Sequence, residues 1–320
     1  MSIPRARRAL DDIPVYRPGK AAASEDRKLS SNENPYPPLP GVMERAAVEL
    51  GRVNRYPDAG MTALYDALSA RFGLSADHFA AGTGSVSVLF SLLNAHLEPG
   101  DEIVYAWRSF EAYPIAVDLT GATAVRVPLR ADATHDLDRF LDAVPEHVLV
   151  VVDEAYVEFV RDPGAADGLA ALATRDNVVV LRTFSKAYGL AGLRVGYAIA
   201  RPQVARAIRK ATPPFSVTDL SQAAAVASLH AQAALDERVE AIVQERHAML
   251  RALRGQGWDV PDTQANFVWL PLGDDATAFA VACDPVSVRP FAGDGVRISV
   301  GAPAVNAELL ERAAAWRASR

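Results

Sequence analysis

The pattern of hydrophobic and polar residues divides this chain into short apolar runs and longer amphipathic stretches. Apolar runs of about four to eight residues are typical of strands buried on both faces of a sheet. Such runs predict strands at residues 102–106, 122–129, 147–152, 178–181, 194–200 and 267–270. Apolar residues three or four positions apart predict helices at residues 40–53, 61–73, 111–119, 165–174, 201–211, 219–255 and 308–319, and another that ends near Leu97. The interval between the strands at 147–152 and 178–181 has room for one helix, as a βαβ unit requires.

The composition is typical of a soluble globular protein. Of the 320 residues 50% are hydrophobic and 22% are charged. The length predicts one large domain and a smaller one, and the net charge of −6 argues against binding to nucleic acid or to an anionic membrane. The single cysteine, Cys283, excludes an intrachain disulfide and predicts a cytoplasmic location. We find no signal peptide, no segment of transmembrane length and no metal-ligand spacing among the histidines.

The chain is predicted to have three sections. Six prolines between Pro14 and Pro40 argue against regular helix or sheet, so residues 1–42 are predicted to form an extended N-terminal arm. Residues 43–215 are predicted to form the large domain. Residues 216–320 are predicted to form linking helices and a small C-terminal domain.

Lys186 occupies an unusual position for a long cation. It follows the apolar run 178–181, next to the hydroxyls of Thr183 and Ser185 and before three glycines. Desolvation at the end of a buried strand lowers the pKa of a lysine, and a neutral amine is a nucleophile that can form a Schiff base. A lone lysine in such a place more often extends to the surface.

A carboxylate and a glycine-rich turn add to this chemistry. Asp153 ends the strand at 147–152, and parallel sheets bind ligands beyond such strand ends. Burial of this carboxylate would be costly without a cationic partner. The turn Gly82-Thr-Gly-Ser85 precedes an apolar helix, whose first N–H groups form an anion site. A dinucleotide-binding fold is the alternative, but Ser87 stands where its third glycine belongs.

Several motifs together resemble the pyridoxal-phosphate aminotransferases of the histidinol-phosphate type. They are Asn32-Glu-Asn-Pro35, Arg55-Tyr-Pro-Asp58, Asp153-Glu-Ala-Tyr156, Ser185-Lys-Ala-Tyr-Gly-Leu-Ala-Gly192 and Val296-Arg-Ile-Ser-Val-Gly301. Two further strings, Gly84-Ser-Val86 and Trp107-Arg-Ser-Phe-Glu-Ala-Tyr-Pro114, resemble the aromatic amino acid aminotransferase branch. The resemblance implies an α/β fold of fold type I, with a mostly parallel central sheet in a large domain and a smaller α+β domain.

The same resemblance implies a site for pyridoxal 5′-phosphate. Lys186 would hold the cofactor as a Schiff base and then act as general base toward the α-proton. Asp153 would keep the pyridine ring protonated, Tyr156 would reach its phenolic oxygen, and Phe110 would stack on the ring. The phosphate would be bound by the backbone of Ser85 and Val86 and by Tyr56, Thr183, Ser185 and Arg194.

Substrate-binding residues and a partner subunit are implied in the same way. Arg297 would bind the substrate α-carboxylate through its planar fork, and Arg289 would lie near the substrate side chain. Asn34 belongs to the element that lies over the active site in the family. The family tyrosine that matches Tyr56 reaches the cofactor phosphate of the other subunit, which implies a homodimer with shared sites. The arm would pack with the small domain and the partner subunit.

The reaction implied by the resemblance is transfer of an amino group between an aromatic amino acid (phenylalanine, tyrosine or tryptophan) and 2-oxoglutarate. Histidinol phosphate is the alternative substrate, because the two branches share almost every motif. A degenerate protein that binds the cofactor without activity is the second alternative. It stays open because one element of the family pattern is missing.

The missing element is a strand expected near residues 136–147. Relatives carry there a strand that ends in an Asn-Pro-x-Asn-Pro-Thr-Gly type motif, whose asparagine contacts the cofactor, whereas here Asp136 to Pro145 leads directly into the next strand. In the family that strand is central to the sheet, so its loss should leave unpaired strand edges. Either this sequence omits a segment that the protein contains, or the protein is a shortened and inactive member. The intact flanking motifs favour omission.

Overall fold

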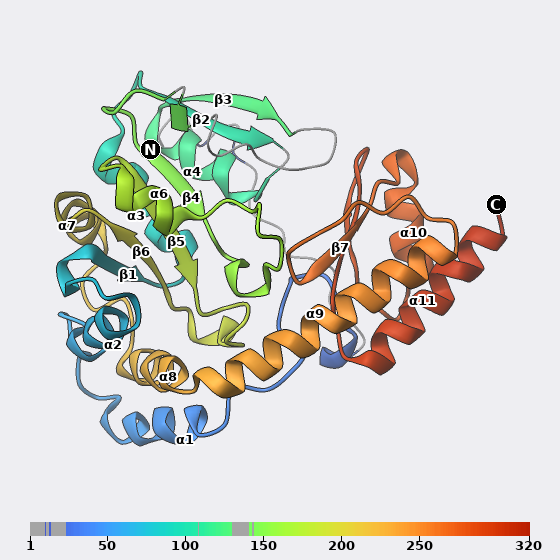
Figure 1. Ribbon diagram of the computed structural model, residues 1–320, viewed down its shortest axis with the longest axis horizontal. Helices are drawn as coiled ribbons and strands as arrows, with labels where there is room; N and C mark the ends of the chain where they lie inside the picture. The colour runs from blue at the N-terminus through green and yellow to red at the C-terminus, as the bar shows by residue number, and fades with distance from the viewer. Residues whose placement is uncertain (1–9, 11–12, 14–23, 108, 130–140, 143) are drawn as a thin grey trace, which may run out of the picture.

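The computed structural model describes residues 24–107, 109–129, 141–142 and 144–320, together with Leu10 and Ile13. Helix α9 (Gln232–Gly255) crosses the molecule and connects two bodies (Figure 1). We call the body formed by residues 42–230 the large part and the body formed by residues 258–320 the small part. The long helix therefore fixes the relative position of the two parts.

The large part is built on a four-stranded sheet. Its strands, in spatial order, are β1 (Phe79–Gly82), β6 (Gly196–Ala200), β5 (Val178–Thr183) and β4 (Val150–Asp153). Strand β6 is antiparallel to both of its neighbours, and the other three strands run in one direction. Strands β4 and β5 are parallel and are joined through helix α6 (Gly168–Thr174), which confirms the βαβ unit expected from the sequence. The fold is α/β, with a mixed sheet whose strands are mostly parallel.

Helices cover both faces of this sheet, which is why its strands are apolar along their whole length. One face packs Val179 and Ala198 against helices α3 (Ser85–His96) and α7 (Pro202–Ala211). The other face packs Val178, Val180, Tyr197 and Ile199 into the main core. Helices on that side are α1 (Val42–Ala47), α2 (Thr62–Phe72) and α8 (Asp219–His230), which pack on one another.

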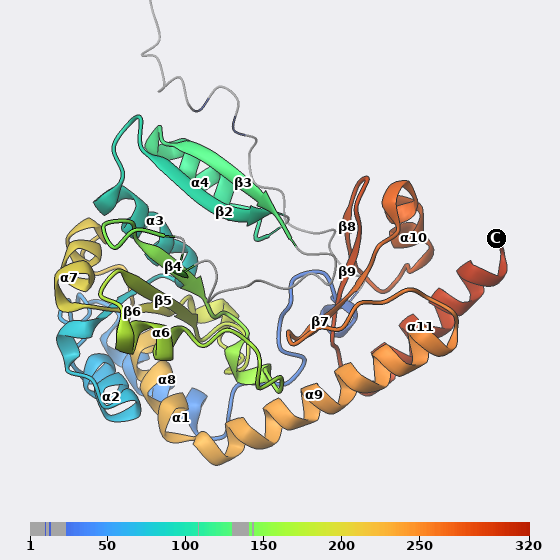
Figure 2. The same ribbon diagram turned by 45° about the horizontal axis from the view of Figure 1, so that its top comes forward.

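Two further strands form a separate ribbon in the described part of the chain. Strands β2 (Glu102–Trp107) and β3 (Thr123–Pro128) are parallel, with helix α4 (Ala112–Thr120) between them in the sequence. They bond only to each other among the described strands, and Figure 2 shows the ribbon standing apart from β4. Among the described strands, β2 and β4 each have one edge without a strand partner, where the sequence predicted unpaired edges. In the interval where the sequence predicted a missing segment, residues 136–140 and 143 lie outside the described residues.

The ribbon also leaves apolar side chains in solvent. Val104, Val125 and Val127 are between 37% and 47% exposed, and they share one face because Val104 pairs with Val125 and Ala106 pairs with Val127. Helix α4 contacts the ribbon, and Tyr105, on the opposite face of β2, is buried and stacks on Tyr113 of that helix. In a sheet covered on both sides these valines would be buried, so the ribbon carries an uncovered apolar face.

The small part is a three-stranded antiparallel sheet with helices on one face. Its strands, in order, are β7 (Phe267–Leu270), β9 (Gly295–Ser299) and β8 (Arg289–Phe291), and its helices are α10 (Ala276–Ala282) and α11 (Pro303–Ala318). The predicted terminal helix begins earlier than expected, at Pro303, because proline suits the first helical position. Strand β1 and helix α10 were not predicted, since each is too short to show a clear period.

The N-terminal arm packs on the small part. Leu29 N–H donates to the Ser287 carbonyl at 2.8 Å, and Ser299 N–H donates to the Leu29 carbonyl at 2.9 Å. The arm thus extends the edge of the β7–β9–β8 sheet and passes on toward the large part. Short 3₁₀ turns complete the fold at Glu25–Arg27, Val48–Arg52, Ala76–His78, Val157–Phe159, Ala191–Leu193 and Gly273–Asp275.

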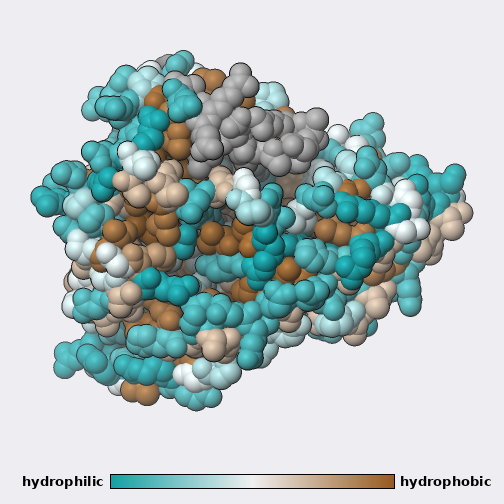
Figure 3. All heavy atoms as spheres, viewed as in Figure 1, coloured by the Kyte–Doolittle hydropathy of each residue, from teal (hydrophilic) through white to brown (hydrophobic). Residues whose placement is uncertain are grey.

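The surface of the molecule is mostly polar in the view of Figure 3, where apolar residues show between polar ones as separate groups. Among the described residues, no helix combines the length and the apolar character needed to cross a bilayer.

Candidate active site

Lys186 lies in the turn that follows β5, and local hydrogen bonds fix the shape of this turn. Thr183 Oγ1 accepts from Ser185 N–H at 3.1 Å and donates to the Val195 carbonyl at 3.4 Å. Asn34 Nδ2 donates to the carbonyls of Lys186 and Ala187, both at 3.0 Å. The arm thus holds the backbone of the lysine turn. In the present structure Asn34 and Thr183 are engaged with protein groups.

The Lys186 amine is enclosed and surrounded by charges. Its Nζ donates to the Ser31 carbonyl at 3.3 Å and lies 5.9 Å from the centre of the Tyr156 ring. Burial, together with the positive charge of Arg297, lowers the pKa of this lysine to about 8, while the charge of Glu33 opposes the shift. A substantial fraction of the amine is therefore neutral near physiological pH, as a nucleophile requires.

This environment predicts how the amine reacts in protein freed of cofactor. The rate of reductive methylation of Lys186 should rise with pH around a midpoint of about 8, whereas the ordinary pKa of a lysine is 10.5. Between these pH values the unfolded chain binds more protons than the folded one, so the free energy of unfolding should increase as the pH rises through this window. Peptide mass spectrometry measures the rate at each pH. A midpoint near 10.5 would contradict the enclosed site.

Asp153 stands at the end of β4 and takes a hydrogen bond from α4. Tyr113 Oη donates to Asp153 Oδ2 at 2.8 Å. Surrounding protein raises the pKa of this carboxyl above its usual value, while the Tyr113 hydrogen bond and the charge of Lys186 lower it. The carboxylate still has an opening to solvent. Asp153 can therefore bind one further cationic group from its open side.

The start of helix α3 forms a cradle for an anion. Gly84 has a φ of 87°, and a Cβ built there would lie 2.4 Å from Arg194 Nη2, so the guanidinium lies against the turn. A Cβ at Gly196 would lie 2.1 Å from the Ser85 nitrogen, which means that β6 passes directly beside the helix start. Only glycine permits both approaches. The first N–H groups of α3, including those of Ser85 and Val86, face the same region as Arg194, where an anion is stabilised.

Arg194 joins this cradle to the lysine turn. Its backbone is in the left-handed region with φ of 53°, a conformation that costs energy for a residue with a side chain. Its Nη1 donates to Ser185 Oγ at 3.5 Å and to the Ala191 carbonyl at 2.8 Å. The strained backbone thus aims the guanidinium at the glycine-rich turn.

A chain of hydrogen bonds connects Tyr156 to the small part. Asn32 Nδ2 donates to Tyr156 Oη at 2.8 Å, and Asn32 N–H donates to Ser299 Oγ at 2.8 Å. Burial raises the pKa of Tyr156, while the nearby charge of Arg297 lowers it. Arg297 Nη2 donates to the Ser30 carbonyl at 3.2 Å. The arm thus lies between the lysine turn and the small-part sheet and contacts both.

The sheet of the small part turns an aromatic and cationic face toward these residues. Strand pairing places Trp269, Arg297 and Arg289 side by side on β7, β9 and β8. Alternation along the strands adds Phe267 and Phe291 to the same face. The Phe267 ring contacts Tyr156 with ring centres 5.5 Å apart, which locates this face at the site.

Of the predicted site residues, Tyr56 lies apart from Lys186 within a single chain, and Phe110 lies at the margin of the site. Tyr56 is 80% exposed and stacks on Phe215, with ring centres 4.7 Å apart. Phe110 is half-exposed and meets Tyr113 edge-on at 6.4 Å. The charges of Asp153, Arg297 and Arg194 lie close enough to Lys186 to act on its pKa, and the Tyr156 ring lies beside its amine. Tyr56, in contrast, is exposed.

Sequence reasoning missed several residues that the structure places here. Tyr113 lies one helical turn after Phe110 in the aromatic motif, so its i+3 spacing was an available signal. Asn32 stands two positions before Asn34 in the Asn-Glu-Asn-Pro element. Glu111 and Trp269 had no such signal, because their roles depend on how the large and small parts meet.

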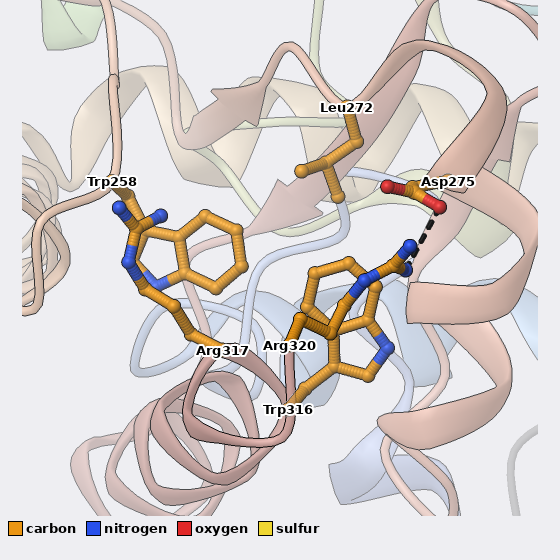
Figure 4. Close-up of a pocket in the computed structure, with 6 residues that line it drawn as sticks. All are labelled: Trp258, Leu272, Asp275, Trp316, Arg317 and Arg320. Carbon is orange, nitrogen blue, oxygen red and sulfur yellow. Dashed lines mark ion pairs between the residues drawn. The ribbon is translucent and has the colours of Figure 1, made fainter.

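A second hollow, of about 380 Å³, lies in the small part away from Lys186 (Figure 4). Its arginines already have partners there. Arg320 forms an ion pair with Asp275 at 2.8 Å, and Arg317 lies 4.9 Å from the ring centre of Trp258. Trp258 in turn stacks on Trp316 at 5.8 Å. We interpret these contacts as packing of α11 on the rest of the small part.

Comparison with known proteins identifies the family of this chain. The family profile described as aminotransferase class I and II matches residues 25–147 and 134–315, in two sections. The chain is 52% identical to an aromatic amino acid aminotransferase from Streptomyces avermitilis, with 96% of each chain covered. It is 50% identical to a protein of the same name from Thermobifida fusca, over 96% of each chain.

These alignments also locate a gap. In the Streptomyces avermitilis comparison 345 aligned positions contain 96% of the 320 residues, or about 307, so about 38 positions of the relative have no counterpart here. By the same arithmetic, about 37 positions of the Thermobifida fusca protein, in an alignment of 344 positions, have no counterpart here. The two sections of the family match meet at residues 134–147, the place where the sequence predicted a missing strand. Relative to these proteins the chain lacks about 38 positions, and the division of the family match lies between β3 and β4 in the sequence.

Solved structures show the same fold. A histidinol-phosphate aminotransferase from Sinorhizobium meliloti in complex with pyridoxal-5′-phosphate has a TM-score of 0.88 and 26% identity, and the match covers 99% of both chains. An aspartate aminotransferase variant from Thermus thermophilus has a TM-score of 0.79 at 20% identity. The family profile, the close relatives and the arrangement around Lys186 agree, and the chain belongs to the class I and II aminotransferases.

Proposed function

We propose that this protein transfers an amino group between an aromatic amino acid and 2-oxoglutarate, with pyridoxal phosphate as cofactor. The observation that carries the proposal is the enclosed amine of Lys186, whose pKa is lowered to about 8. It lies in electrostatic contact with Asp153 on the large part and with Arg297 on the small part. An amine, a carboxylate and a guanidinium so arranged suit a reaction at the α-carbon of an amino acid.

The residues present fit pyridoxal phosphate. The cradle made by Gly84, Gly196, Arg194 and the start of α3 suits a phosphate, since N–H groups and a guanidinium converge there without side-chain obstruction. Asp153 suits a ring nitrogen that carries a proton, because its desolvated carboxylate gains from a cationic partner. When bound, this cofactor supplies an electron sink that allows the α-proton of an amino acid to leave.

The chain supplies binding and proton transfer around that centre. Lys186 would hold the cofactor and, when displaced by the substrate amine, would accept the α-proton at Nζ and return it. Arg297 would bind the α-carboxylate with two parallel hydrogen bonds. Tyr156 and Asn32 would orient the groups at the phenolic side of the ring. The remaining phosphate contacts would come from Ser185 and Thr183 and, from a second subunit, Tyr56.

An aromatic substrate is favoured by the face of the small-part sheet. Phe267, Trp269 and Phe291 line this face beside Arg297, and the rings of Trp269 and Phe291 lie 5.7 Å apart. Such rings bind another aromatic ring through its apolar faces and edges. The relatives at 50–52% identity carry the name aromatic amino acid aminotransferase. Histidinol phosphate is the second candidate, because Arg289 lies on the same face and a structural neighbour bears that name.

Steady-state kinetics separate these substrates. We expect kcat/KM for phenylalanine or tyrosine with 2-oxoglutarate to exceed that for histidinol phosphate by roughly tenfold or more, the discrimination that one mismatched polar contact confers. The reverse order would replace the proposal by the second candidate. Cofactor binding without turnover of any of these substrates would support the third alternative, a degenerate cofactor-binding protein.

We also propose a homodimer with shared sites. The region around Tyr56 exposes a group of large apolar side chains in the single subunit, as an interface does. They are Met43, Val48, Leu50, Val53, Tyr56 and Phe215. A second copy that covers this region would bury the ring of Tyr56 and bring its hydroxyl to the cradle of its neighbour.

The division into an arm (1–42), a large domain (43–215) and linking helices with a small domain (216–320) is part of the same proposal. Packing of α8 on α1 and α2, and the course of α9 into the small part, are consistent with it. The contacts of Leu29 with Ser287 and Ser299 support the arm's packing on the small domain. The cytoplasmic location stays a prediction from the sequence.

A further inference from the structure

One ion pair joins the large and small parts directly beside the aromatic face. Arg289 Nη2 donates to both Oε1 and Oε2 of Glu111, each at 3.1 Å. Glu111 stands at the start of α4, directly after Phe110, and Arg289 stands on β8. The side chains are 29% and 14% exposed, so the pair is partly desolvated. An ion pair in such a place is stronger than one on an open surface.

The position of Arg289 explains why an anion is needed there. Arg289 and Arg297 are directly opposed across the antiparallel strands β8 and β9. Like charges directly opposite on one face of a sheet repel each other. Arg297 is the arginine that would take the substrate α-carboxylate, while Glu111 reaches Arg289 from the other body of the molecule. Glu111 thus supplies a counter-charge to Arg289 on this face, and it does so from the large part.

The groups around this pair are aromatic. The Arg289 guanidinium lies 5.7 Å from the ring centre of Phe291. Trp269 lies across β9, where a Cβ at Gly295 would be 2.7 Å from its indole. When the substrate α-carboxylate binds Arg297, its side chain would extend along this face. There it would contact the aromatic rings and the guanidinium of Arg289, whose charge Glu111 neutralises. Such a surface suits a flat apolar group and offers little to an anionic one.

We propose that Glu111 is a specificity-determining residue that sets the substrate class of this site by neutralising Arg289. With the pair closed, the side-chain subsite accepts aromatic rings. A phosphate ester, or the distal carboxylate of 2-oxoglutarate, must compete with Glu111 for Arg289. The second carboxylate of a dicarboxylate can bind Arg289 only if it displaces Glu111. The free energy of the Glu111–Arg289 ion pair is then lost, and the affinity for the dicarboxylate is lower by that amount. This inference rests on the proposed function, because it assumes that the substrate α-carboxylate binds Arg297.

The test compares two unreactive ligands on the holoenzyme by calorimetry. Glutarate has a second carboxylate for Arg289, whereas 3-phenylpropanoate presents a ring. In Glu111→Gln, which keeps the shape of the side chain and removes its charge, the affinity for glutarate relative to 3-phenylpropanoate should rise by roughly tenfold, since close charge pairs have couplings of that size or larger. In the double variant Glu111→Gln, Arg289→Gln this rise should disappear.

A matched control removes another ion pair between charged side chains. Arg161 and Glu240 lie 3.3 Å apart, away from the aromatic face, so Glu240→Gln should leave the affinity ratio as it is. The inference is overturned if Glu111→Gln leaves the ratio of the two affinities unchanged or weakens the binding of both ligands equally. It is also overturned if Glu240→Gln raises the ratio as much as Glu111→Gln does. If the unaltered protein binds no 3-phenylpropanoate, the aromatic proposal itself fails. Glutarate affinity alone then still reports whether Glu111 competes for Arg289.

Discussion

Replacing Lys186 by alanine is expected to reduce transamination by a factor on the order of 10²–10⁴ or more, because a positioned general base contributes that much. Lys186 is the amine that the arm, Tyr156 and Arg297 enclose, and its pKa of about 8 depends on that enclosure. Stopped-flow absorbance of the half-reaction with phenylalanine measures the loss, and circular dichroism checks that the variant folds.

The control is a lysine outside the site. Lys210, in the last turn of α7, should tolerate alanine with the rate unchanged within about twofold, as exposed substitutions usually do. Retention of more than a tenth of the activity in Lys186→Ala would contradict the assignment.

The same variant tests whether the sites are shared. A heterodimer of Lys186→Ala and Tyr56→Phe subunits contains one site with both native residues if Tyr56 serves the partner's site. Mixing two weakly active proteins should then restore a fraction of the activity. If each chain supplies its own Tyr56, mixing restores nothing, and the observed exposure of Tyr56 needs another explanation.

Inserting the internal segment of a close relative is expected to have the second largest effect. About 38 positions of the Streptomyces avermitilis protein have no counterpart here, and the family match is divided at residues 134–147. A strand placed between β2 and β4 would supply hydrogen-bond partners to both open edges. It would also cover valines of the ribbon and Val148 that are 37–47% exposed.

We expect the insertion to raise the free energy of unfolding by roughly 1 kcal/mol for each valine that becomes covered, since a fully buried valine contributes roughly 1.5–3 kcal/mol. The denaturant m-value should increase as well, because more surface becomes buried in the folded state. Urea unfolding of the protein with and without the insertion measures both quantities. A shuffled segment of equal composition is the control. Equal stability with the native and shuffled segments would show that β2 and β4 do not accept a strand.

Sequence patterns predicted the parts of the site that depend on local chemistry. The lysine turn, the aspartate after β4 and the cradle at α3 were predicted because strand ends, glycines and helix starts are encoded in neighbouring residues. The βαβ unit from Asp153 to Lys186 followed from spacing alone. The gap near 136–147 stays a prediction from the sequence, and the described strands form separate sheets, one ending at β4 and the other made of β2 and β3.

Contacts between distant segments could not be predicted. The hydrogen bond from Tyr113 to Asp153 spans 40 residues, and the pair of Glu111 and Arg289 spans 178. Both depend on where α4 lies relative to β4 and to the small part. Asn34 carries no local sign that its amide holds the backbone of Lys186. These side chains acquire their partners only when the arm, the ribbon and the small part meet.

The most direct measurement of the central claim does not require turnover. Borohydride reduction of the protein incubated with pyridoxal phosphate fixes the cofactor to the lysine that holds it, and peptide mass spectrometry identifies that lysine. The proposed site predicts modification of the peptide that contains Ser185, Lys186 and Ala187, in the protein with or without the inserted segment. Modification of another lysine, such as Lys28 or Lys210, with Lys186 left free would contradict it.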